Sequence, residues 1–165
     1  MTYAVSTLAG AQPIANTDTT QKHVLGTIVR ANDPTYGEGE FIYLLGVAST
    51  VVGNMVTYNT TTYQTALTPT TGTTDGAPIA IAMSANVASQ YGWYQISGNA
   101  VVKKTGVAVA PSTGLWLSGT TGRFYVTASA GKGIVGARTA NLATVVTTTS
   151  TVVVTINRPS IETHT

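Results

Sequence analysis

The chain has no cysteine among its 165 residues, which excludes disulfide bonds and thiolate metal sites. It also has no run of about 18 apolar residues, so the sequence predicts no membrane-spanning helix. The first residues, "MTYAVSTLAGAQPIA", have neither the basic region nor the sustained apolar core of a secretory signal, and we expect none. Packing and hydrogen bonds must therefore hold the fold together.

Charge is also scarce, because charged residues make up 8% of the chain against about 25% in ordinary soluble domains. The basic residues are scattered and the formal net charge is +2, so no basic stripe is available to neutralise the phosphates of a nucleic acid. Threonine, in contrast, fills 32 positions. A surface so poor in charge favours a protein that works in an assembly, where partners cover it. The alternative is a Thr-rich β-protein with a neutral surface.

From residue 25 onward, short β-branched and aromatic runs are separated by Gly, Pro, Asn and Thr, which is typical of an all-β fold. Turn residues predict hairpins within 96–102 and 115–126. Helix is nearly excluded, and only 83–90 could form a single turn. The predicted strands are 25–30, 40–47, 54–58, 62–67, 78–83, 92–97, 100–104, 114–118, 123–127, 133–137, 142–147 and 151–157.

The chain also resembles itself at a shift of 55 residues, where "GAPIAIAMSANVA" (76–88) matches "GKGIVGARTANLA" (131–143). A hairpin-like stretch precedes and follows each copy. A single unit of three or four strands could not bury its apolar face alone. We therefore expect one β-rich domain over 25–165, with a short C-terminal tail, built as a small barrel or sandwich from two related meanders.

Residues 1–24 show no strong period of 2 or 3.6, which predicts an extended N-terminal arm. The arm has too few large apolar residues to build a core, so we expect it to dock on a neighbouring protein. The strand around Trp93 has large side chains on both faces, and we expect one face to pack the core and the other to meet a partner. The candidate interface residues are Tyr3, Leu8, Ile14, Tyr91, Tyr94 and Trp116.

The low charge and the two-faced strand also predict a symmetric homo-oligomer, with a trimer favoured over a dimer. Inside the domain, we expect a core that is rich in β-branched and aromatic side chains. The residues expected to be largely buried are Ile81, Trp93, Ile96, Val102, Leu117 and Ile134.

A search for catalytic groups finds little. His23 and His164, which could act as bases near neutral pH, lie in terminal regions. Glu38 and Glu40 could lie on one strand face, but their sequence context favours a solvated turn. Aromatic residues near 91–94, 116 and 124–125 could form a stacking platform for sugars or bases, although their alternation with aliphatic residues favours core and interface. We expect no enzyme, no cofactor and no metal site.

Three stretches resemble a family of small proteins of tailed bacteriophages that act as capsid decoration or cement proteins. They are "GTIVRANDPTYGEGEFIYLLGVAS" (26–49), "SANVASQYGWYQISGNAVV" (84–102) and "VVVTINRP" (152–159). The resemblance implies a β-rich protein on the outer surface of an icosahedral head, made in the host cytoplasm and bound to the major capsid protein. It supplies no catalytic residue. A virion adhesin that binds host carbohydrate is the alternative function, and a small hydrolase is a third.

Overall fold

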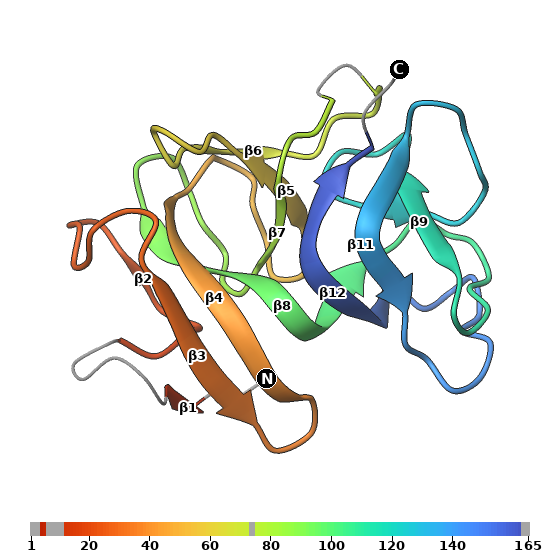
Figure 1. Cartoon of the computed structure of the whole chain (residues 1–165), viewed down its shortest axis with the longest axis horizontal. Coiled ribbons are helices and arrows are strands. Elements are labelled where there is room, and N and C mark those ends of the chain that lie inside the picture. The colour runs from red at the N-terminus through yellow and green to blue at the C-terminus, as the bar shows by residue number, and fades with distance from the viewer. Residues whose placement is uncertain (1–3, 6–11, 73–74, 163–165) are drawn as a thin grey trace.

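The computed structural model describes residues 4–5, 12–72 and 75–162, and for residues 4–5 it describes the backbone alone. In these ranges the chain forms twelve β-strands and no α-helix, so the all-β prediction is confirmed. The strands pair antiparallel into one curled sheet (Figure 1). They are β1 (Ala4–Val5), β2 (Thr17–Asp18), β3 (Ile28–Asp33), β4 (Gly37–Leu45), β5 (Met55–Tyr58), β6 (Thr65–Leu67), β7 (Ile79–Ala82), β8 (Tyr91–Lys103), β9 (Gly114–Leu117), β10 (Phe124–Tyr125), β11 (Gly133–Thr139) and β12 (Thr151–Ile161).

The long strand β8 lies at the centre of the fold. Its first part pairs with β4 and its last part pairs with β12. The predicted hairpin turn within 96–102 is therefore wrong. Gly98 takes a φ of +96°, and a Cβ there would lie 2.5 Å from the Glu38 carbonyl oxygen. The glycine thus allows β4 to cross closely over a bent but continuous strand.

Two units of the same design share β8, which agrees with the predicted internal repeat, but neither unit is a meander, because the strand after each hairpin pairs with the hairpin's first strand. Unit 1 runs from β4 to β8, and unit 2 runs from β8 to β12. In each unit a hairpin follows the first strand, the next strand pairs with the hairpin, and the last strand pairs with both that strand and the first. Parallel bridges at Leu45–Gln64 and Lys104–Phe124 return each hairpin's outer arm to the first strand.

Backbone hydrogen bonds show how the two units correspond. Ala82 N donates to Asn54 O at 2.9 Å in unit 1, and Thr139 N donates to Thr113 O at 3.0 Å in unit 2. The loops that follow correspond as well, because Asn86 N donates to Thr50 O and Val145 N donates to Val109 O. The repeated sequence aligns Asn86 with Asn141 instead. The two registers differ because β11 contains a bulge at Gly136 and the loop after it is longer.

Three hydrophobic clusters fill the molecule. One lies inside unit 1, a second and larger one lies mainly inside unit 2, and a third covers the outer face of β3, β4 and β8. All six predicted core residues are at most 6% exposed, so that prediction is confirmed. The predicted strand at 142–147 is reduced to a single bridge at Val145, and 83–90 forms no helical turn.

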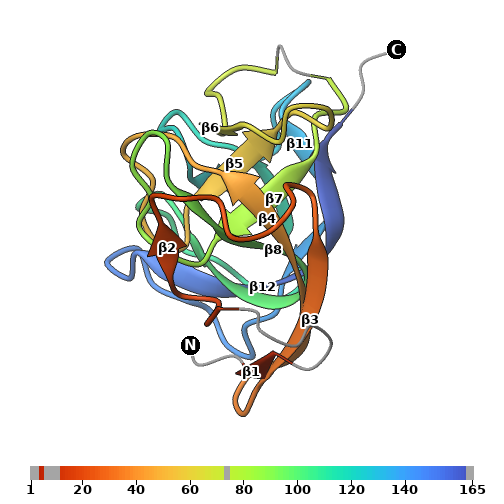
Figure 2. The ribbon, with the colours of Figure 1, turned by 90° about the vertical axis from the view of Figure 1, so that its left-hand side faces the viewer.

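The N-terminal segment, residues 12–27, packs on its own domain, which differs from the predicted arm (Figure 2). In this segment β2 pairs with the start of β8. Ile14 is only 2% exposed and belongs to the cluster that contains Trp93. Upstream of the segment, β1 pairs with β3. The chain itself therefore covers both faces of the Trp93 strand. Ile14 packs in the cluster on the outer face, where burial of the large indole ring removes apolar area from solvent.

Candidate functional site

The outer face of unit 1 contains a filled groove, which we call groove 1. Tyr43 on β4 and Tyr91 and Trp93 on β8 form its floor. His23 of the N-terminal segment lies over them, with its ring centroid 5.2 Å from Tyr43 and 5.4 Å from Trp93. Ile14 fills the rest. Burial raises the pKa of Tyr43, although the Lys22 N–H that donates to its hydroxyl opposes this shift.

Unit 2 carries the corresponding groove, groove 2. Tyr94 lies opposite Ala82, and Val154 lies opposite the equivalent residue Thr139, so Tyr94 and Val154 occupy equivalent positions. One residue earlier, Trp93 corresponds to Val153. The cross-strand neighbours of these two residues, Tyr43 and Val101, then correspond as well, and Tyr91 corresponds to Thr151.

Groove 2 is open, in contrast to groove 1. A hollow of about 430 Å³ lies over Val101, Thr151 and Val153. The residues that line it are uncharged. They are Tyr36, Val101, Asn141, Thr144, Val145, Val146, Thr149, Thr151, Val152 and Val153. Of these, Val146 is 57% exposed, and Leu142, next to Asn141 in the sequence, is 100% exposed. Groove 2 is thus an uncharged hollow with apolar side chains in contact with solvent.

A buried lysine holds the wall of groove 2 in place. Lys104 is fully buried, and its ammonium donates to the carbonyl oxygens of Val146 at 3.0 Å and Val107 at 2.7 Å. Burial lowers the pKa of this lysine, because desolvation disfavours the charged form. Asn141 also ties the loop down by donating to the Val109 carbonyl at 3.0 Å. These bonds give the 140–150 loop a defined position beside β12.

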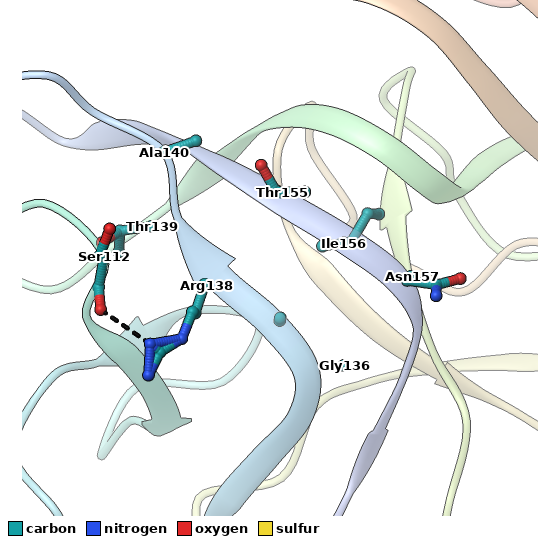
Figure 3. Close-up of a pocket in the computed structure, with 9 residues that line it drawn as sticks. Ser112, Gly136, Arg138, Thr139, Ala140, Thr155, Ile156 and Asn157 are labelled. Carbon is teal, nitrogen blue, oxygen red and sulfur yellow. Dashed lines mark hydrogen bonds between the residues drawn. The ribbon is translucent and has the colours of Figure 1, made fainter.

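A larger hollow, of about 570 Å³, lies beside the bulge of β11 (Figure 3). Arg138 on β11 donates to the Ser112 carbonyl across it at 3.1 Å. Gly136 allows the close approach of β12, because a Cβ there would lie 2.7 Å from the Asn157 carbonyl oxygen. Ser112 and two threonines line this hollow, but its lining contains no His, Asp or Glu that could act as a base for their hydroxyl groups.

A third hollow, of about 490 Å³, contains the two glutamates considered above. Arg30 lies 3.6 Å from Glu38 and 3.4 Å from Glu40, and Arg158 lies 3.1 Å from Glu40. These carboxylates face guanidinium groups, and no histidine lines this hollow. The arrangement is that of a surface ion-pair network, and it adds no support to the hydrolase alternative.

The structure disperses the candidate interface residues. Tyr94 is fully buried inside unit 1, where its hydroxyl accepts from Asn86 at 2.7 Å. Ile14 is buried in groove 1. Both side chains are covered by their own chain, so neither can meet a partner in this conformation. Tyr91 and Trp116 are partly exposed, on β8 and β9. Tyr3 and Leu8 lie outside the described residues.

Sequence reasoning missed Val101, Thr151, Val153 and Leu142, which form or border groove 2. The internal repeat was the signal that could have found them. It would have done so only with the register that the structure shows, in which β8 serves both units.

In the part of the chain that the structure describes, no group of three or more His, Asp or Glu side chains is placed to hold a metal ion. The same residues contain no helix long and apolar enough to cross a membrane. Comparison of the chain with protein-family models and with curated proteins gives no match.

Proposed function

We propose that the chain is a structural virion protein that decorates and stabilises the icosahedral head of a tailed bacteriophage by binding its major capsid protein. It is made in the host cytoplasm, acts on the outer surface of the capsid, and works as a homo-oligomer, with a trimer favoured. The three stretches that resemble capsid decoration proteins motivate this proposal. The all-β fold agrees with it.

The distribution of exposed apolar side chains is the observation that carries the proposal. Five of the eight large hydrophobic side chains that are exposed in the described ranges lie in three loops, 46–54, 83–90 and 140–150. These five are Val51, Val52, Val87, Leu142 and Val146. The three loops contain no Asp, Glu, Lys or Arg. Such loops suit contact with a protein surface through apolar burial rather than through ion pairs.

The test is co-sedimentation of the purified chain with undecorated heads of the phage that encodes it, at about 0.1 M and about 1 M salt. We expect equal occupancy, because screening at about 1 M salt acts on charges beyond about 3 Å and leaves apolar contacts in place. Val87→Asp should lower occupancy. Val135→Asp, at a position 52% exposed on β11, serves as the matched control. Failure of the parent chain to bind, or its release at high salt, would refute the proposal.

The carbohydrate adhesin remains a second candidate because of one pair of side chains. Trp116 and Tyr125 lie directly opposite each other on β9 and β10, and both are partly exposed. Two neighbouring rings can stack on a sugar. A glycan array decides this candidate, since binding that disappears in Trp116→Ala would favour the adhesin over the capsid protein.

A further inference from the structure

We propose that groove 2 is a docking site for an extended, uncharged peptide segment of the protein on which the chain assembles. The segment inserts one aliphatic side chain between Val101, Val153 and the 140–150 loop. The proposal rests on the proposed function only in taking this partner to be the major capsid protein. The groove itself is argued from the chain's own repeat.

Groove 1 shows which ligand this architecture binds. An extended segment runs over the outer face of unit 1, pairs through β2 with Tyr91 and Gly92, and buries Ile14. The positions in unit 2 that correspond to Tyr91 and Gly92 are Thr151 and Val152. Both units therefore present the same backbone arrangement at this place, and an extended segment of the chain covers it in unit 1.

The backbone of unit 2 leaves room for an added strand. Thr151 and Val152 pair with β8 on one side. On the other side, β11 pairs with β12 as far as Val154, and a last backbone bond runs from Ala140 N to Val153 O at 2.8 Å. β2 lies at the corresponding place in unit 1, so an incoming segment would add to the sheet there through main-chain hydrogen bonds.

An unpartnered polar atom in groove 2 points to a hydrogen-bond donor in the ligand. The side-chain oxygen of Asn141 is buried and has no hydrogen-bond partner in the structure, while its nitrogen donates to Val109 and Ala143. An amide oxygen in this state accepts a backbone N–H of a peptide. The charge-free lining of the groove selects against charged ligands, since a buried charge without a partner is costly.

The size of the floor residues explains why the chain itself covers one groove and leaves the other open. Groove 1 has two tyrosines and a tryptophan, which would expose a large apolar area if left uncovered. In groove 2, valine and threonine take their places and leave a hollow of about 430 Å³. Leu142, which follows the lining residue Asn141 in the sequence, is fully exposed.

The first experiment uses a peptide as the probe. A capped peptide with the sequence of residues 12–17, Gln-Pro-Ile-Ala-Asn-Thr, is titrated into the methyl-labelled full-length protein and followed by NMR. We expect saturable shifts at Val101, Val146 and Val153. Val146→Asp should weaken binding at least tenfold. Val135→Asp, at a position that is 52% exposed against 57% for Val146 and is not part of the groove 2 lining, should bind as the parent does.

A peptide with Asp in place of its isoleucine should give no shifts at these methyl groups. Shifts confined to the groove 1 methyl groups of Ile14, Val29 and Met83 would overturn the proposal, because the peptide would then only replace the chain's own segment. Equal weakening by Val135→Asp would overturn it as well.

The second experiment tests the partner. Leu142→Asp and Val146→Asp should each lower occupancy on undecorated heads about tenfold, with Val135→Asp unchanged. If the parent chain fails to bind heads while the peptide still binds groove 2, the proposed function falls and the groove stands. If heads bind and the peptide does not, the groove assignment falls alone. Loss of self-association in Val146→Asp would overturn the partner assignment in favour of a second copy of this chain.

Discussion

Grooves 1 and 2 have the same backbone plan but different roles. In groove 1, Tyr43 and Trp93 are buried in the core beneath a segment of the same chain, and the partly exposed Tyr91 packs against them. In groove 2, the corresponding Val101 and Val153 remain partly exposed. The two surfaces differ in the size of their side chains and in whether a segment of the chain lies over them. A segment that packs on large rings is stabilised in proportion to the apolar area that the contact removes from solvent.

The largest expected effect comes from removing the ring that requires the cover. Trp93→Ala should lower the free energy of unfolding by about 3–5 kcal/mol, because a fully buried indole leaves a cavity. The equivalent change in unit 2, Val153→Ala, should cost about 1 kcal/mol. Urea denaturation of the two variants measures both. Similar losses would show that the two grooves do not differ as described.

The next effect concerns the cover itself. Ile14→Ala should lower the free energy of unfolding by about 2–4 kcal/mol, since Ile14 is 2% exposed within the cluster. Val24→Ala in the same segment is the control, because Val24 is 76% exposed and should change stability by less than about 0.5 kcal/mol. If thermal melting of Ile14→Ala matches the parent, residues 12–24 would act as the free arm that the sequence predicts.

Alkaline pH should distinguish the units through a buried tyrosine. Burial raises the pKa of Tyr94 above its ordinary value of 10.0, so the folded state keeps the phenol neutral while the unfolded chain ionises. The contribution of the neutral, buried Tyr94 to the free energy of unfolding is therefore fully present below pH 10.0 and is lost as the pH rises towards the folded-state pKa. The Tyr94→Phe variant should lose less stability between about pH 9 and pH 11 than the parent. Equal slopes in pH-dependent urea melts would contradict this.

The buried Lys104 changes stability with pH in the opposite direction, but the comparison of parent and Tyr94→Phe still isolates the tyrosine. Its folded-state pKa is lowered from 10.5, so its contribution to stability rises with pH up to that value. The lysine is present in both variants, and its effect cancels in the difference between them.

The smallest effect is expected at the edge of groove 2. Leu142→Ser should leave the free energy of unfolding within about 0.5 kcal/mol of the parent, because the leucine is fully exposed. The corresponding loop of unit 1 contains Met83, which is 6% exposed in the groove 1 cluster. Met83→Ser should destabilise the fold clearly. A marked loss in Leu142→Ser would mean that groove 2 is covered in solution by the chain itself.

Much of the fold was predictable from the sequence because its signals are local. The alternation of β-branched and aromatic residues, with Gly and Asn at turns, predicts an all-β chain and places most strands within a few residues. The burial of Ile81, Trp93 and Ile134 also follows from pattern. The repeat of 76–88 in 131–143 correctly indicated two related units.

The errors arose where long-range contacts decide between readings that are locally equal. Gly98 and Asn99 suit a hairpin turn as well as a bent strand, and only the close crossing of Glu38 determines that β8 continues. Residues 12–24 contain few large apolar side chains, but Ile14 packs with Trp93 of the distant strand β8 and so holds the segment on the domain. For the same reason, Tyr94 and Ile14 were wrongly predicted to contact a partner, whereas both are buried in their own chain.

The fold class, the internal repeat, the core positions and the charge-poor surface were evident from the sequence, because each depends on side-chain chemistry along a short stretch. The tertiary structure alone decided that the units share β8, that the chain fills groove 1, and that groove 2 stays open. These features depend on residues that meet across distances in sequence from 48 positions, as Lys103 and Thr151 do, to 75 positions, as Thr17 and Gly92 do. Such meetings are set by packing of the whole chain, and no local pattern contains them.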